Sequence, residues 1–72
     1  MEREIIQSSD IRSVGYDDET SILEVEFKSG NVYQYVNVPE HVYDELMKSE
    51  SKGRYFNSEI RDRYPNSKIE YN

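Results

Sequence analysis

The sequence predicts an α+β domain in which a three-stranded antiparallel β-meander is followed by two helices that pack on one face of the sheet. Two observations lead to this fold class. In the first half of the chain, apolar residues alternate with polar ones, which is typical of half-buried strands. After Pro39, apolar residues recur instead at spacings of three and four, which is typical of helices with one buried face.

The chain length of 72 residues fits one small domain. We take residues 1–72 as that domain, with a core at about 8–65 and frayed ends at 1–7 and 66–72. Without cysteine, the chain can form neither disulfides nor thiolate metal sites. It shows no apolar run near the ~18 residues of a membrane span and no signal-peptide pattern. We therefore expect a cytoplasmic protein that does not associate with membranes.

The strands follow from alternation and from the turns between them. The first strand is expected at 11–16, followed by a polar turn at 17–20. Segment 22–27 alternates strictly between apolar and polar residues, which predicts a half-buried antiparallel strand. After a short turn at 28–30, the segment 31–38 is rich in Val and Tyr and predicts the third strand.

The turn between the second and third strands decides where Tyr33 and Tyr35 point. With Gly30 in the left-handed position of a three-residue bulged loop, Val25 pairs with Tyr33 and Leu23 with Tyr35. Both tyrosines then share the apolar face. A two-residue loop would shift the pairing by one residue and turn both tyrosines to the opposite face. We favour the bulged loop, because it requires glycine at its third position.

The first helix is predicted to begin near Pro39, which suits a first helical turn because it has no N–H to leave unpaired. Val42, Tyr43, Leu46 and Met47 then lie on one arc of the helix and form its buried face. A polar stretch rich in serine ends this helix.

A second helix is predicted from Arg54 to Tyr64. Phe56, Ile60 and Tyr64 recur at every fourth position and would form its buried face. The helix should stop before Pro65, because the residue that precedes a proline disfavours the helical conformation.

Neither catalysis nor metal binding is expected. His41 is the only histidine, and its helical spacing to Asp44 and Glu45 is common by chance on solvated helices. Glu24 and Glu26 alternate outward on a strand and are expected to be solvated rather than buried with raised pKa values. The chain also lacks a glycine-rich loop that would cradle phosphate. We expect no enzyme, no metal and no cofactor.

Tyr33 and Tyr35 have two interpretations. Aromatic side chains on a sheet can stack on the bases of single-stranded nucleic acid. Alternatively, both rings form the floor of the core beneath the helices, with their hydroxyls at its rim. We favour the core, because the helices must cover the face on which the predicted register places both rings. Tyr55 in the second helix is a further possible aromatic contact.

Charge is unevenly distributed along the chain, whose net charge is −6. Residues 1–50 carry four basic and twelve acidic side chains, whereas residues 51–72 carry five basic and three acidic ones. An acidic domain repels polyanions at long range. Any contact with nucleic acid would therefore use the C-terminal segment.

The second helix carries the basic residues that suggest a ligand. On a helical wheel, Arg54 and Arg61 share the solvent face with Asn57, and Lys52 lies one turn earlier. Lys52, Arg54 and the free amides near Gly53 could hold a phosphate at the helix N-terminus. The alternative is a solvated helix face that binds nothing.

Three blocks of sequence occur in the order and spacing of a known family. They are the run 11–17, the Tyr33-x-Tyr35 pair and the block Ser-Lys-Gly-x-Tyr-Phe-Asn-x-x-Ile-Arg at 51–61. Through them the chain resembles the KTSC domain family over residues 8–65. That family is named for a domain at the C-terminus of some lysyl-tRNA synthetases and includes short bacterial and phage proteins. The residues that fall on its motifs are Tyr33, Tyr35, Lys52, Gly53, Tyr55, Asn57 and Arg61.

The resemblance implies RNA as a ligand, because the family's domain is fused to a synthetase. It covers none of the synthetase body, so aminoacylation is not implied. Our first hypothesis is a small non-enzymatic module that binds RNA or another phosphate-bearing ligand through Lys52, Arg54, Asn57 and Arg61. The alternative is a protein-interaction module, either a homodimer or a phage-type modulator of a host protein. It would use acidic residues 17–26 or an exposed tyrosine surface, and the acidic majority of the chain favours it.

Overall fold

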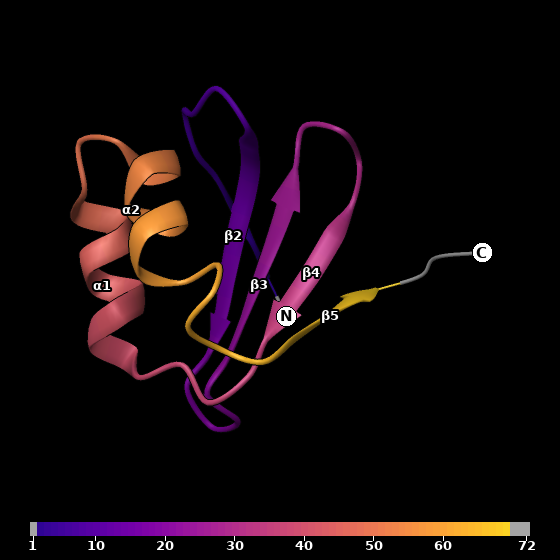
Figure 1. Cartoon of the computed structure of the whole chain (residues 1–72), viewed down its shortest axis with the longest axis vertical. Helices are drawn as coiled ribbons and strands as arrows, with labels where there is room; N and C mark the ends of the chain where they lie inside the picture. Colours follow the sequence, from indigo (N-terminus) through magenta and orange to yellow (C-terminus); the bar gives the residue numbers. More distant parts are fainter. Residues whose placement is uncertain (1, 70–72) are drawn as a thin grey trace.

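A computed structural model describes residues 2–69 as a five-stranded antiparallel sheet with two helices on one side (Figure 1). In chain order the strands are β1 (Glu4–Ile5), β2 (Ile11–Asp17), β3 (Ile22–Phe27), β4 (Val32–Tyr35) and β5 (Asn66–Ile69). The helices α1 (Glu40–Lys48) and α2 (Lys52–Glu59) lie between β4 and β5 in the chain. The predicted α+β class is confirmed, but the predicted number of strands was wrong.

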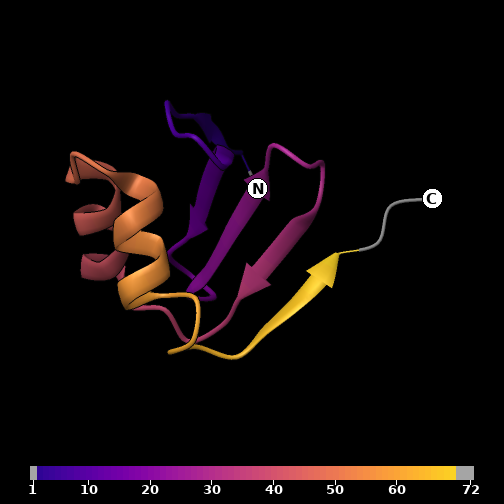
Figure 2. The same cartoon turned by 45° about the horizontal axis from the view of Figure 1, so that its top comes forward.

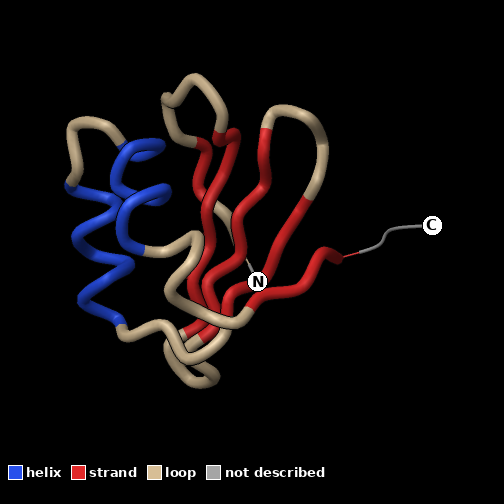
Figure 3. The backbone as a smooth tube through the Cα atoms, viewed as in Figure 1, coloured by secondary structure: helices blue, strands red, loops and turns tan. Residues whose placement is uncertain are grey.

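The two additional strands lie in the segments that were expected to fray. β1 pairs with β2, with Glu4 opposite Val14, and β5 pairs with the outer edge of β4, with Ile69 opposite Val32 (Figure 3). An exposed sheet edge can bind almost any extended segment through backbone hydrogen bonds, so little side-chain alternation is needed there. Residues 1 and 70–72 of the predicted ends lie outside the described residues.

The hairpin between β3 and β4 confirms the predicted bulged loop. Gly30 has a φ of 98°, and its N–H donates to the carbonyl of Phe27 at 2.9 Å. The N–H of Phe27 in turn donates to the carbonyl of Asn31 at 2.9 Å. Tyr33 and Tyr35 therefore pair with their predicted partners on β3, and both lie on the side of the sheet that the helices cover.

β4 is shorter than the strand predicted over 31–38, because the chain bends after Tyr35. Asn37 adopts a φ of 60°, which is incompatible with a continuing strand. The N–H of Val38 then donates to the carbonyl of Ser21 at 2.9 Å, and this hydrogen bond holds the chain across the end of the sheet.

Helix α1 begins directly after Pro39, as predicted, and buries Val42 and Leu46. The serine-rich stretch that follows supplies the start of α2. Ser51 is its N-cap and accepts a hydrogen bond from the N–H of Arg54 at 3.4 Å.

Helix α2 ends at Glu59 rather than at Tyr64. Ile60 leaves the helical conformation, with a φ of −123°, and its side chain is fully buried in the core. The amides of Ile60 and Arg61 both donate to the carbonyl of Phe56, at 3.0 and 2.9 Å, so this carbonyl of the last helical turn has two partners where the helix ends. Arg61 therefore belongs to the turn after α2, so its predicted position on a helical wheel was wrong.

The core lies between the helices and the sheet. Leu23, Val25, Tyr35, Val42, Leu46, Phe56 and Ile60 are buried as predicted, and Ile11, Val14 and Val38 complete the core. Phe27, Tyr43, Met47 and Tyr64 were also expected to be buried but are only half-buried at its edge. None of the helices in residues 2–69 is long and apolar enough to cross a membrane. The buried core residues are Ile11, Val14, Leu23, Val25, Tyr35, Val38, Val42, Leu46, Phe56 and Ile60.

Candidate functional site

An open groove of about 560 Å³ lies between α2, β4 and the turn that joins β3 to β4. It exists because α1 and α2 do not cover the whole sheet: β5 extends beyond them at the far edge (Figure 2). Its volume lies within the range of about 300–1,000 Å³ that is usual for small-molecule sites.

Aromatic rings form the floor of this groove. The ring of Phe56 meets Tyr35 edge to face, with centroids 5.3 Å apart, and meets Phe27 in the same way at 5.5 Å. Phe27 contacts Tyr33 edge to face at 5.8 Å. Tyr35 is only 4% exposed and belongs to the core, as we favoured, whereas Tyr33 is half-buried and lines the groove. Of the two tyrosines, only Tyr33 has ring surface to offer a ligand.

Burial also changes the acidity of Tyr35. Loss of solvent around its hydroxyl raises the pKa of Tyr35 to about 12, because the phenolate is poorly stabilised there. Tyr33 and Asp62 raise it further, and the positive charge of Arg61 opposes them. The Tyr35 hydroxyl therefore stays protonated at neutral pH and remains a hydrogen-bond donor.

The rim of the groove is polar and nearly balanced in charge. Three asparagine side chains line it, and each amide can both donate and accept hydrogen bonds. Two cationic and two anionic side chains lie among them. These rim residues are Asn31, Asn57, Asn66, Lys28, Arg61, Asp10 and Asp62.

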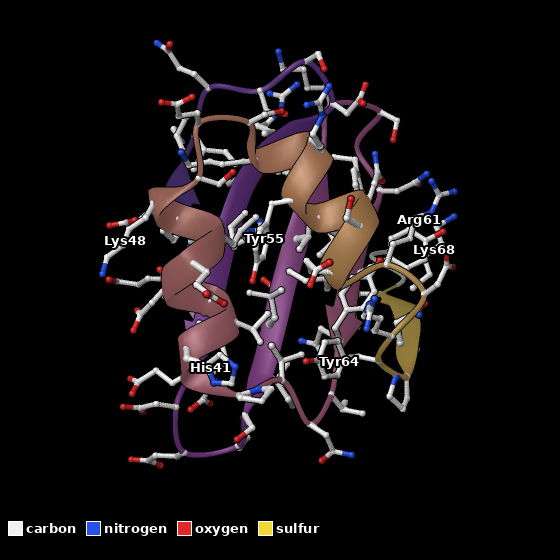
Figure 4. All side chains as sticks on the ribbon, turned by 60° about the vertical axis from the view of Figure 1, so that its left-hand side comes forward. His41, Lys48, Tyr55, Arg61, Tyr64 and Lys68 are labelled. Carbon is white, nitrogen blue, oxygen red and sulfur yellow. The ribbon has the colours of Figure 1, made fainter. Side chains whose placement is uncertain are left out.

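Lys68 extends this surface along β5. It is exposed and lies directly opposite Tyr33 in the β4–β5 pairing, so the two side chains emerge on the same face of the sheet. In Figure 4, Arg61 and Lys68 lie toward the same edge of the view, whereas Lys48 and His41 lie across it on α1. The basic side chains at the groove thus come from different parts of the fold: Lys28 and Arg61 line it, and Lys68 lies beside it on β5.

The predicted phosphate residues lie along two adjoining hollows rather than on one helix face. Lys52 and Arg54 line a second, smaller hollow of about 350 Å³, whereas Arg61 lines the first groove. Asn57 and Gly53 line both. The structure thus brings Lys52, Arg54 and Asn57 together and places Arg61 on the other side of Asn57.

Two of the groups expected to bind phosphate already have protein partners. The Nζ of Lys52 donates to the carbonyl of Ser49 at 3.1 Å. The N–H of Arg54 donates to the Ser51 hydroxyl, so the prediction of free amides now applies only to the first-turn N–H groups of Lys52 and Gly53. The guanidinium of Arg54 is exposed and is the more available cation of this hollow.

Tyr55 lies outside both hollows. It is half-buried between α1 and α2, where its hydroxyl donates to Glu45 Oε2 at 3.0 Å (Figure 4). Burial, together with this hydrogen bond to the carboxylate, raises the pKa of Tyr55 to about 12. Its position indicates a contact between the helices rather than an aromatic contact with a ligand.

Glu24 differs from its prediction. Its side chain was expected to be solvated, but the residue is only 7% exposed. Its carboxylate accepts hydrogen bonds from Arg3 at 3.1 Å and from Gln34 at 2.8 Å, on the face of the sheet away from the helices. The cause is the N-terminal segment, which the sequence did not place and which crosses this face. Glu26 is half-buried there and accepts a hydrogen bond from Ser13 at 2.9 Å.

His41 is exposed on α1 near Asp44 and Glu45 in the sequence. Within residues 2–69, the structure gathers no group of three or more histidine, aspartate and glutamate side chains that could hold a metal ion.

Sequence reasoning missed several residues of the groove. Lys28 was assigned to a turn, Asn31 to the start of the third strand, and Asn66, with its neighbour Lys68 beside the groove, to a frayed end. The strand Asn66–Ile69 is polar at its first three positions, so it carries no apolar–polar alternation from which a strand could be predicted.

Comparison with known proteins places this geometry in context. The family model for the KTSC domain matches residues 7–64. An uncharacterised protein from Stutzerimonas stutzeri is 47% identical over 64 residues, which cover 89% of this chain and 90% of that protein. A lysine–tRNA ligase from Nostoc punctiforme is 38% identical over 58 residues, which cover 81% of this chain but 10% of the ligase. The crystal structure of a KTSC domain protein from Yersinia pestis superposes with a TM-score of 0.94 at 38% identity, covering 96% of this chain and 97% of that one.

Proposed function

This chain belongs to the KTSC domain family, and we propose that it is a small non-enzymatic module that binds single-stranded RNA along α2 and the neighbouring edge of the sheet. The observation that carries the proposal is the continuity of the two hollows. They share Ser9, Asp10, Gly53 and Asn57, so one surface combines an aromatic groove with the basic side chains of Lys52, Arg54 and Arg61, among which the acidic side chains of Asp10 and Glu50 also lie.

That combination suits a single strand better than a duplex. Sequence-tolerant binding of single strands uses aromatic rings for the bases and a basic track for the backbone. Here Tyr33 and Phe27 supply partly exposed rings, and Arg54 and Arg61 lie on the two sides of Asn57. A base-paired helix would keep its bases stacked away from rings that lie within a groove.

The relatives support RNA as the ligand class. A segment of a lysine–tRNA ligase is 38% identical to this chain, and a second ligase, from Trichormus variabilis, is 40% identical over the same length. The chain spans 10% of each ligase, so the shared part is a small domain within a protein whose name refers to tRNA.

The acidic balance of the chain limits the electrostatic part of this binding. With a net charge of −6, the domain as a whole repels a long polyanion. Binding therefore depends on local contacts, and we expect a shallow dependence on salt, of about 0.7 in the logarithmic slope for each phosphate contacted by the protein.

Titration of the labelled protein with short single-stranded RNA, followed by NMR, tests the proposal. At low salt, amides of α2 and β4 should shift, and a duplex RNA of equal length should shift them less. The double variant Arg54→Gln/Arg61→Gln should stay folded and bind weakly. Its matched control is Arg12→Gln/Arg63→Gln, which removes the same charge from exposed arginines that line neither hollow.

Two results would contradict the proposal: absence of RNA binding by the parent at low salt, or equal binding by the two double variants. A protein partner would then become the leading hypothesis. The acidic segment 17–26 suits such a partner less well than its composition suggests, because Glu24 and Glu26 lie on the far face and are engaged with Arg3 and Ser13.

A further inference from the structure

We propose that the groove receives one unpaired nucleobase, which stacks on Tyr33 while the phosphate of the same nucleotide binds between Arg61 and Lys68. This inference rests on the proposed function, because it names the part of the RNA that the groove recognises. It also adds Lys68, on β5, to the binding surface.

The size of the groove favours a base over a phosphate alone. A volume of about 560 Å³ is that of a site for a ligand of nucleoside size. A phosphate group would leave most of that space, and all of the aromatic floor, without a partner.

Two rings of the floor are half-buried, those of Phe27 and Tyr33, and Tyr33 is the one that lies opposite Lys68 of β5. Tyr35 is 4% exposed and can contribute little area. Tyr33 is half-buried, and its ring is held edge to face against Phe27, with an interplanar angle of 79°. Phe27 is held in the same way by the buried ring of Phe56, at 74°. Tyr33 is therefore a pre-positioned platform that does not need to be ordered when a base stacks on it.

The rim matches the chemistry of a base edge. Base edges present hydrogen-bond donors and acceptors side by side, and asparagine amides carry both. Asn31, Asn57 and Asn66 supply three such amides from the hairpin turn, α2 and β5. The charges of Lys28 and Arg61 are balanced by Asp10 and Asp62, so the groove suits an uncharged ring.

The phosphate site follows from the position of the two cations. Lys68 lies opposite Tyr33 in the sheet, and Arg61 lines the groove from the turn after α2. Figure 4 shows both side chains toward the same edge of the view. Neither of the two ion pairs within residues 2–69 involves Arg61, so its guanidinium does not have to leave a carboxylate to bind phosphate.

The test compares the full-length protein's affinity for two RNA probes of equal length and charge, an oligouridylate and the same oligomer with abasic sites. A docked base should make the abasic probe bind about tenfold more weakly or worse, because stacking on an aromatic side chain contributes about 1–3 kcal/mol per base. Equal binding of the two probes would overturn this inference and leave the proposed function intact. Failure of both probes to bind would instead overturn the proposed function.

Variants of Tyr33 test whether its ring contacts the RNA base. Tyr33→Phe keeps the ring and should bind the oligouridylate within about twofold of the parent, whereas Tyr33→Leu should bind about tenfold more weakly. Tyr43→Leu is the control, since Tyr43 is half-buried on α1 and lines neither hollow. Full affinity in Tyr33→Leu would overturn the stacking role. If Tyr33→Leu does not fold, the two RNA probes decide the question.

Lys68→Gln and Lys48→Gln form a second matched pair. Both lysines are exposed, but Lys48 lies across the molecule on α1 (Figure 4). Lys68→Gln should lower the salt slope of RNA binding by about 0.7, the value for one lost phosphate contact, and Lys48→Gln should leave it unchanged. An identical slope in both variants would remove Lys68 from the site.

Discussion

Arg3 donates a hydrogen bond from Nη1 to Glu24 Oε2 at 3.1 Å, and this ion pair joins the segment ahead of β1 to β3, the central strand of the sheet. The other oxygen of the Glu24 carboxylate accepts from Gln34 at 2.8 Å, so partners on both sides satisfy a residue that is only 7% exposed. Polar contacts therefore hold the N-terminal segment against the far face of the sheet, whereas the apolar core lies between the other face and the helices.

Removal of Arg3 should destabilise the fold. Arg3→Met keeps the length of the side chain but leaves the buried carboxylate of Glu24 with one partner fewer, and we expect a loss of about 1–3 kcal/mol in the free energy of unfolding. Urea denaturation measures it. Arg12→Met, at an exposed site on β2, is the control and should stay within about 0.5 kcal/mol of the parent. Equal stability of the two variants would show that the Arg3–Glu24 ion pair contributes nothing to the free energy of unfolding.

Gly15 on β2 leaves room for the N-terminal segment. A Cβ atom at this position would lie 2.5 Å from the carbonyl oxygen of Glu2 and 2.9 Å from Cγ of Arg3. Gly15→Ala should therefore displace that segment and cost about 1–3 kcal/mol. Faster amide exchange at Ile6, whose N–H donates to β2, would report the displacement.

Gly53→Ala is the matched control for this prediction. Its added Cβ would find the Ser8 hydroxyl oxygen as its nearest neighbour, at 3.4 Å, so little has to move. We expect a change within about 1 kcal/mol. A loss of stability as large as that of Gly15→Ala would argue against the steric explanation.

Phe56 holds the core and the groove floor together. It is 1% exposed and contacts Phe27 and Tyr35 edge to face. Phe56→Ala should cost about 3–5 kcal/mol, which is comparable to the total stability that a core of this size supplies, about 3–5 kcal/mol. The variant should lose the dispersion of its amide NMR spectrum, whereas Phe56→Leu should keep it. A folded Phe56→Ala protein would mean that the core is less dependent on this ring than its burial indicates.

The raised pKa of Tyr35 predicts that the folded protein loses stability at alkaline pH. Its pKa is about 12 in the folded protein and about 10 when unfolded, so the folded state retains a proton that the unfolded state releases. The Tyr35 contribution is fully present below pH 10 and is lost as the pH rises towards 12. To isolate the contribution of Tyr35 ionisation, the free energy of unfolding is measured for the parent and for Tyr35→Phe on both sides of pH 10. The gap between the two proteins should change only above pH 10, and a constant gap would contradict the prediction.

Local sequence was sufficient for the centre of the fold. The alternation of residues 22–27 and the position of Gly30 predicted the hairpin register correctly, because loop length and the left-handed conformation of one glycine determine pairing over a few residues. The start of α1 after Pro39 was predicted for a similar reason, since a proline determines its own φ. Tyr35 was correctly assigned to the core from that register.

The sequence did not determine what depends on distant partners. β5 is a strand because it pairs with the outer edge of β4, and α2 ends at Glu59, where Ile60 leaves the helical conformation while its side chain stays buried. Hydrogen bonds between segments more than 30 residues apart leave little local pattern, so Lys68 could not be placed beside Tyr33 from the sequence alone. Residue types and local periodicity thus determined the fold class, the hairpin and most of the core. Only the tertiary structure decided the far-face ion pair and the groove, because both are made by side chains that are distant in the sequence and that the assembled sheet and helices bring together.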